Sequence, residues 1–251
     1  MSQSIKVAKH LLLQLSGIIG LVVLWEMWVV ARSVNAIVLP GPTSVVLELI
    51  HEPSIYLLNG LHTLALALAG LALGTLLGTT TAVLAWSSRL LEGILTPLGL
   101  IFASVPIVAL IPLIARILGY DVRTELAIVT LISFFPSFVF TMKGLKMLPA
   151  GSADLFQSLG ATRWQHLVWL ALPSSLPSWL TGFRVAAPHA VLAAVVAEFL
   201  MGTYGLGHEL EGARSDLQMQ RALAASLSAT LIAVVFFLFS AWLERRLLLN
   251  R

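Results

Sequence analysis

The sequence predicts an all-α integral membrane protein that forms a single domain over residues 1–251, with about six transmembrane helices. Hydrophobic residues make up 58% of the chain and charged residues only 11%, whereas soluble domains carry about 25% charged residues. Apolar runs long enough to cross a bilayer recur along the whole chain. Because one soluble core cannot bury so much apolar surface, the surplus must face lipid.

Six apolar runs approach or exceed the length of about 20 residues that a spanning helix needs. They cover residues 11–31, 61–86, 94–118, 125–142, 176–200 and 222–243. The first run follows Lys6 and Lys9 and is longer than the apolar part of a signal peptide. This length favours a retained helix over the alternative, a cleaved signal peptide.

Lysine and arginine residues are distributed unevenly between the two sets of connections. The set that includes both termini and residues 143–175 holds Lys6, Lys9, Arg89, Lys143, Lys146, Arg163, Arg245, Arg246 and Arg251. The opposite set holds Arg32, Arg123, Arg214 and Arg221, with Arg116 near a helix end. Cytoplasmic connections are the richer in these residues, so we expect both termini and residues 143–175 to be cytoplasmic.

Glycine and proline residues give further expectations along the chain. Residues 40–42, Pro-Gly-Pro, end the first helix, after which Thr43 either caps a short surface helix at 44–51 or lies in a plain loop. Gly70, Gly74 and Gly78 follow one helix face and predict close approach of another helix.

Prolines fall inside several of the apolar runs, at Pro106, Pro112, Pro136 and Pro188. A proline in a spanning helix frees a carbonyl group that protein or water must satisfy. These residues therefore indicate kinked helices around a cavity, or bends that serve packing alone.

The polar segment at about residues 150–173 predicts two short helices joined at an angle. Ser152 can cap the first helix, whose initial turn contains Asp154, and Gly160 can end it in a left-handed conformation. Apolar residues at helical spacing form a stripe, namely Leu155, Phe156 and Leu159. Residues 162–165, Thr-Arg-Trp-Gln, have the form of a capping box that starts a second helix. Such a segment either binds a protein outside the membrane or lies on lipid headgroups.

The spacing within this segment resembles the coupling motif of binding-protein-dependent ABC importer permeases, which reads Glu-Ala-Ala, three residues, Gly, nine residues, Ile-x-Leu-Pro. Asp154 stands at the Glu position, Gly160 at the Gly, and Leu170-Ala-Leu172-Pro173 at the final four. Leu155 and Phe156 replace the two alanines. Other segments resemble the nitrate/sulfonate/taurine-type subfamily, namely 104–112, 134–136, 158–164, 180–184, 196–198 and 205–207.

The resemblance implies a type I ABC importer permease fold, in which this chain is the membrane subunit of a bacterial inner-membrane importer and forms a homodimer. It also implies two partners: a cytosolic ATPase dimer, which binds ATP and magnesium, and a periplasmic or lipid-anchored solute-binding protein. The ATPase would dock on Asp154, Leu155, Phe156, Leu159, Gly160, Ala161, Thr162, Arg163 and Trp164. The chain itself is expected to be no enzyme and to hold no cofactor; it has no Gly-Lys dipeptide and hence no Walker A loop.

Candidate residues for the translocation path or its gate are Arg184, His189, Glu198, Pro106 and Pro136. Ionisable residues inside a membrane are costly and usually functional; the alternative is that each is paired for packing. No metal site is predicted, because the chain has no cysteine and residues 208–211, His-Glu-Leu-Glu, do not match the zinc motif His-Glu-x-x-His. Scattered basic residues give no sign of nucleic-acid binding.

The subfamily resemblance implies a small solute, and a small anion such as an organic sulfonate, taurine or nitrate is the preferred substrate. A pyrimidine precursor of thiamine or another small aromatic is the alternative. A different class, the ion-coupled secondary transporter, would need repeated halves and intramembrane carboxylates, which fit this sequence less well.

Overall fold

The computed structural model describes residues 2–104, 106–202 and 204–249, and within these ranges it contains helices and turns without a β-strand. Val105 and Arg251 lie outside these ranges, and the side chains of Lys6 and Lys9 are not described. The helices are α1 (Ser2–Ala31), α2 (Pro42–His51), α3 (Pro53–Ser87), α4 (Arg89–Ser104), α5 (Ile107–Leu118), α6 (Val122–Lys146), α7 (Ser152–Ser158), α8 (Arg163–His166), a π-helix (Leu167–Ala171), α9 (Leu172–Met201), α10 (Leu206–Ser215) and α11 (Met219–Leu249).

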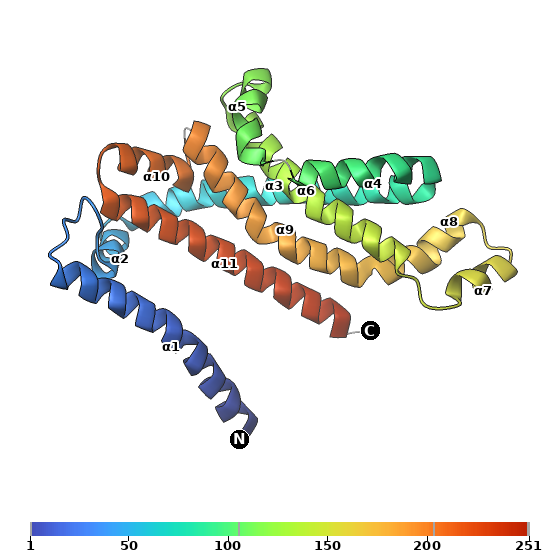
Figure 1. Cartoon of the computed structure of the whole chain (residues 1–251), viewed down its shortest axis with the longest axis horizontal. Coiled ribbons are helices and arrows are strands. Elements are labelled where there is room, and N and C mark those ends of the chain that lie inside the picture. The colour runs from blue at the N-terminus through green and yellow to red at the C-terminus, as the bar shows by residue number, and fades with distance from the viewer. Residues whose placement is uncertain (1, 105, 203, 250–251) are drawn as a thin grey trace.

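The centre of the molecule is a bundle in which α6 packs against both α3 and α9, and α11 packs against α9. Its core contains many alanines, among them Ala67, Ala186, Ala190 and Ala194. Figure 1 shows α7 and α8 at one end of this bundle and α2 and α10 at the opposite end, while most of α1 stands apart from it. The two ends therefore have separate sets of short helices.

The glycine ladder on α3 allows the close approach of α6, as the sequence predicts. A Cβ atom added at Gly74 would lie 2.5 Å from the carbonyl oxygen of Thr130, and one added at Gly78 would lie 2.6 Å from that of Phe134. A Cβ at Gly70 would overlap the side chain of Val129. Membrane helices commonly use small residues in this way, because no hydrophobic effect between helices drives their association in lipid.

Four of the six predicted spans are confirmed as helices with the length and composition needed to cross a membrane. Among the described residues these are Pro53–Ser87, Val122–Lys146, Arg163–Met201 and Met219–Leu248. The described apolar part of α1, Ser16–Ala31, is shorter, as is the apolar part of α5, Val108–Leu118.

The prediction of one continuous helix over residues 94–118 is wrong. Helix α4 ends at Ser104 and α5 begins at Ile107, with Pro106 in an extended conformation between them (φ −65°, ψ 99°). Proline has no N–H to continue the helical hydrogen bonds, and it disfavours helical geometry in the residue before it. Pro112, Pro136 and Pro188, in contrast, lie inside helices.

The short surface helix after the first span is confirmed, but its predicted cap is wrong. Helix α2 begins at Pro42, and Gly41 rather than Thr43 stands at the N-cap. The carboxylate of Glu26 on α1 accepts a hydrogen bond from the Thr43 amide at 3.1 Å. A negative group at a helix N-terminus is stabilising, so Glu26 joins the end of α1 to the start of α2.

Candidate coupling segment and translocation path

The bend of the candidate coupling segment is built around Gly160. The Gly160 amide donates to the Gln157 carbonyl and the Ala161 amide donates to the Phe156 carbonyl, each at 3.0 Å. These two bonds form a Schellman motif, which requires a left-handed residue after the helix. Gly160 has φ +70°, as expected from its place in the sequence.

The start of α7 differs from the expectation that Ser152 caps it. Gly151 occupies the N-cap with φ +72°, and Ser152 is the first helical residue. The Ser152 hydroxyl donates instead to the Pro149 carbonyl at 2.6 Å. The connection after α6 therefore turns through a glycine before α7 begins, and Asp154 still lies in the first turn.

The capping box predicted at residues 162–165 is confirmed. The Thr162 side chain accepts from the Gln165 amide, and the Gln165 side chain accepts from the Thr162 amide. Helix α8 then continues through the π-helix into α9, so residues 163–201 form one helical rod. The π-helix ends at Ala171, two residues before Pro173, which has no amide hydrogen to donate to an ordinary helical bond.

The apolar stripe of the segment divides into an exposed part and a half-buried part. Leu155 and Leu159 are 56% and 73% exposed, as is Trp164 at 71%. Phe156 is half-buried against His166, with ring centroids 5.9 Å apart, and His166 in turn lies 5.7 Å from Trp86. The segment is thus held from one side by Phe156, while Leu155 on α7 and Leu159 at its C-cap face outward.

Arg184 has a carboxylate partner within the chain. Its Nη1 atom lies 3.1 Å from Oε2 of Glu244 on α11, and its guanidinium lies over the ring of Phe237. The Thr181 hydroxyl donates to the same carboxylate at 3.1 Å. These contacts join α9 to α11, and the positive charge of Arg184 is neutralised by Glu244.

Glu198 is completely buried at the opposite end of α9, where it joins three helices. Its Oε2 atom accepts hydrogen bonds from the Thr63 hydroxyl at 2.8 Å and from the Gly207 amide at 3.1 Å. His62 Nδ1 lies 3.3 Å from the other carboxylate oxygen. The carboxylate therefore stands at the N-terminus of α10, where negative charge is stabilised.

The glycines at 205 and 207 make room for this carboxylate. A Cβ atom at Gly205 would overlap the Glu198 carboxylate, and Gly205 also has φ +100°, a value that side-chain-bearing residues rarely adopt. A Cβ at Gly207 would overlap the backbone of α9 at Val195. The Gly205 amide donates a hydrogen bond to Asn59 Oδ1 at 3.1 Å, so α3 also orients this turn.

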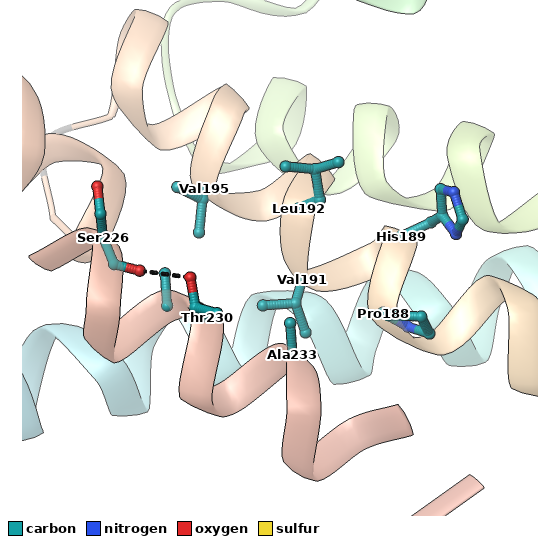
Figure 2. A pocket seen from close by; sticks show the side chains of 9 residues that line it. Pro188, His189, Val191, Leu192, Val195, Ser226, Thr230 and Ala233 are labelled. Atoms are coloured by element: carbon teal, nitrogen blue, oxygen red, sulfur yellow. Dashed lines mark hydrogen bonds between the residues drawn. The ribbon is translucent and has the colours of Figure 1, made fainter. Parts of the chain in front are cut away.

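His189 lies on α9 between two apolar cavities. The larger has a volume of about 420 Å³ and lies between α9 and α11, with Leu192, Val195, Ser226 and Thr230 among its lining residues (Figure 2). The smaller, of about 110 Å³, lies among α5, α6 and α9. The described residues that line the two cavities include no lysine or arginine.

The three ionisable candidates on α9 do not form one cluster. At 1.5 Å per residue, Arg184 and Glu198 are separated by about 21 Å along the helix axis, and His189 lies between them. Pro106 is the N-cap of α5, and Pro136 lies inside α6. Thr63 and Asn59 make contacts that no local sequence pattern indicates, because their partners lie more than 130 residues away.

Comparison with known families decides what kind of membrane protein this is. Residues 53–249 match the family described as binding-protein-dependent transport system inner membrane component. The chain belongs to this family. The match covers the whole bundle from α3 to α11, including the coupling segment, so the ABC importer permease expected from the resemblance is confirmed.

Relatives of this permease include transporters of different solutes. The formylaminopyrimidine transport permease protein ThiX of Halalkalibacterium halodurans is 36% identical over 75% of this chain and 75% of its own length. The taurine transport system permease protein TauC of Escherichia coli is 30% identical over 73% of this chain and 64% of its own length.

The fold of this permease is also that of a solved importer. An inward-facing structure of the MetNI methionine ABC transporter aligns with a TM-score of 0.63 and 19% identity, over 78% of this chain and 96% of the MetNI chain. This likeness confirms the type I ABC importer permease fold expected from the sequence.

Proposed function

We propose that this permease carries a small solute inward through the membrane and receives its driving force from a separate cytosolic ATPase that docks on α7 and α8. ATP and magnesium would be bound by that ATPase, and a solute-binding protein would deliver the solute from outside. The permease would act as a homodimer in a bacterial inner membrane. The observation that supports docking most directly is the pair of exposed leucines, Leu155 on α7 and Leu159 at its C-cap, next to the Gly160 bend.

The geometry suggests how motion would pass from the ATPase to the membrane. Helix α7 connects through the Gly160 bend to a rod that runs without interruption from Arg163 to Met201. Phe156 and His166 hold α7 against the start of that rod. A displacement of α7 by the ATPase would therefore be transmitted along α9, which lines both apolar cavities.

Co-purification tests this role. The tagged permease, solubilised in mild detergent, is expected to bring down an ABC ATPase at about one copy per permease. Leu159→Ser is the variant to compare with the wild type, since it changes an exposed side chain alone, and it is expected to bring down less ATPase. A permease that purifies without any ATPase, under conditions in which a known importer stays intact, would count against ATPase docking on α7 and α8.

For the substrate, the charges of the structure favour a neutral heterocycle over the small anion that the sequence alone prefers. Moving an anion into an apolar cavity is costly unless a cation or strong hydrogen-bond donors compensate it. The described residues that line the cavities beside His189 include no lysine or arginine, and Arg184 is paired with Glu244. The His189 ring and the Ser226 and Thr230 hydroxyls can hydrogen-bond a neutral pyrimidine, the class of solute named for ThiX.

Uptake measurements distinguish the two candidate substrates, the neutral pyrimidine and taurine. Cells that express the permease with its ATPase and binding protein are expected to accumulate formylaminopyrimidine, and excess taurine is expected not to compete. Uptake of taurine that formylaminopyrimidine does not inhibit would instead support a substrate of the sulfonate class.

A further inference from the structure

We propose that the end of the bundle beside the coupling segment binds the phosphate headgroup of an anionic phospholipid. The site consists of two cavities that share Arg89 and Glu92 at the start of α4. The first, about 620 Å³, extends from the end of α3 to α8. The second, about 470 Å³, extends from α4 to Lys146 at the end of α6. This site is separate from α9 and its cavities, and it does not depend on which solute is carried. It shares Arg163 and Trp164 with the segment on which we propose that the ATPase docks.

The site carries an excess of positive charge. Arg89 lines both cavities, Arg163 lines the first and Lys146 lines the second, whereas Glu92 is the single acid among the described lining residues. Glu92 is already paired, since its carboxylate lies 2.6 Å from the Lys146 ammonium. Arg163 donates to the Ser87 carbonyl at 3.3 Å, which leaves its charge uncompensated. Arg89 has no ion-pair partner within the ranges that the structure covers.

Two buried polar atoms in these cavities have no hydrogen-bond partner among the described residues. They are Nε2 of His166, in the first cavity, and Oγ1 of Thr96, in the second. Buried polar groups in proteins are nearly always hydrogen-bonded, so an unpaired one calls for an explanation. A phosphate group has several acceptor oxygens, so in either cavity it could accept from the unpaired atom there while it neutralises Arg89, which lines both cavities.

The surroundings of the site fit a lipid better than a free phosphate ion. Trp86 and Trp164 line the first cavity, and tryptophans are enriched where a membrane protein meets the headgroups. Leu84 and Leu90 are exposed at 58% and 72% beside the arginines. Figure 1 shows α4 and α8 meeting at the same end of the bundle. Apolar surface next to a basic pocket suits an acyl chain attached to a phosphate, and basic pockets between membrane helices on the cytoplasmic side bind anionic lipid headgroups.

Native mass spectrometry of the purified full-length chain tests the proposal, with phosphatidylglycerol and phosphatidylcholine supplied in equal amounts. The wild type is expected to retain phosphatidylglycerol preferentially. Arg89→Gln is expected to lower that retention about fivefold, the effect of one basic residue near an anionic lipid. Arg32→Gln is the matched control, because Arg32 follows α1 at the opposite end of the bundle and is expected to leave retention unchanged. The melting temperature of each variant should match the wild type.

Three results would overturn the proposal. The first is equal retention of phosphatidylglycerol by the wild type and Arg89→Gln, or an equal loss in the Arg32→Gln control. The second is displacement of the lipid by inorganic phosphate at moderate ionic strength, which would identify a site for the free ion. The third is loss of the co-purifying ATPase from Arg89→Gln with unchanged lipid retention, which would assign the cavities to the protein partner.

Discussion

Gly160 is required for its backbone conformation rather than for space. A Cβ atom at this position would meet nothing within 4 Å, yet the residue has φ +70°. A left-handed conformation costs roughly 1–2 kcal/mol for most residues, and asparagine adopts it more readily than others. Proline cannot adopt it, because its ring fixes φ near −65°.

We therefore expect Gly160→Pro to abolish substrate-stimulated ATP hydrolysis by the assembled importer, while Gly160→Asn retains most of it. Both variants should insert into the membrane, because the bend lies outside the spans. Membrane fractionation supplies the control for insertion. Normal stimulation in Gly160→Pro would show that the bend is not part of coupling.

Gly205 differs from Gly160, because it is required both for its backbone conformation and for the space that a side chain would fill. It has φ +100°, and any Cβ would overlap the buried Glu198 carboxylate. We expect Gly205→Ala to lower the free energy of unfolding by at least ~2 kcal/mol, from strain and from displacement of the carboxylate.

Gly212, inside α10, provides a matched control for Gly205 at the N-cap of that helix. A Cβ there meets nothing within 4 Å, so Gly212→Ala should be neutral or stabilise by about 0.5–1 kcal/mol. Thermal unfolding in detergent measures both variants. Equal melting temperatures for the two would mean that the Glu198 network contributes little to stability.

At the scale of a whole element, α7 is a helix of seven residues with no buried side chain. An isolated helix of that length is unstable in water, so α7 depends on its ends and on the Phe156–His166 contact. Its exposed leucines are then available to a partner. Burying a leucine completely stabilises an interface by about 1.5–3 kcal/mol.

Leu159→Ser should therefore weaken ATPase binding by about 10- to 100-fold, with no change in the melting temperature of the permease alone. Gln157→Ser, an exposed substitution on α7 two residues before Leu159, is the control and should bind normally. The dissociation constant of the ATPase, measured on the reconstituted complex, provides the test. Equal binding by both variants would place the interface elsewhere.

Elements defined by local rules were predictable from the sequence. The Gly160 bend, the capping box at Thr162 and the glycine ladder on α3 each follow from neighbouring residues, and the structure has all three. The break at Pro106 was missed because hydropathy alone cannot distinguish a kinked helix from a broken one.

Contacts between distant segments were not predictable. Glu198 was recognised as a costly buried charge, but nothing local identifies Thr63 or the Gly207 amide as its partners. The pairing of Arg184 with Glu244 likewise depends on how α9 packs against α11. Long-range pairing is set by the fold, so one sequence shows that a buried charge needs a partner without showing which one.

At the scale of the whole molecule, the two ends of the bundle differ in chemistry. One end has α7, α8 and the start of α4, with Arg89, Lys146 and Arg163. The other end has α2 and α10, with the Glu198 network between them and the bundle. Because cytoplasmic connections are the richer in lysine and arginine, we expect the first end to face the cytoplasm.

This orientation can be measured directly, because the chain has no cysteine of its own. Ser215→Cys, at the end of α10, should react with a membrane-impermeant maleimide in intact spheroplasts. Ser158→Cys, at the end of α7, should react only after the membrane is opened. Both serines are exposed, so a difference in labelling reports the side of the membrane rather than burial. Labelling of Ser158→Cys in intact spheroplasts would invert the topology and remove the coupling segment from any cytosolic ATPase.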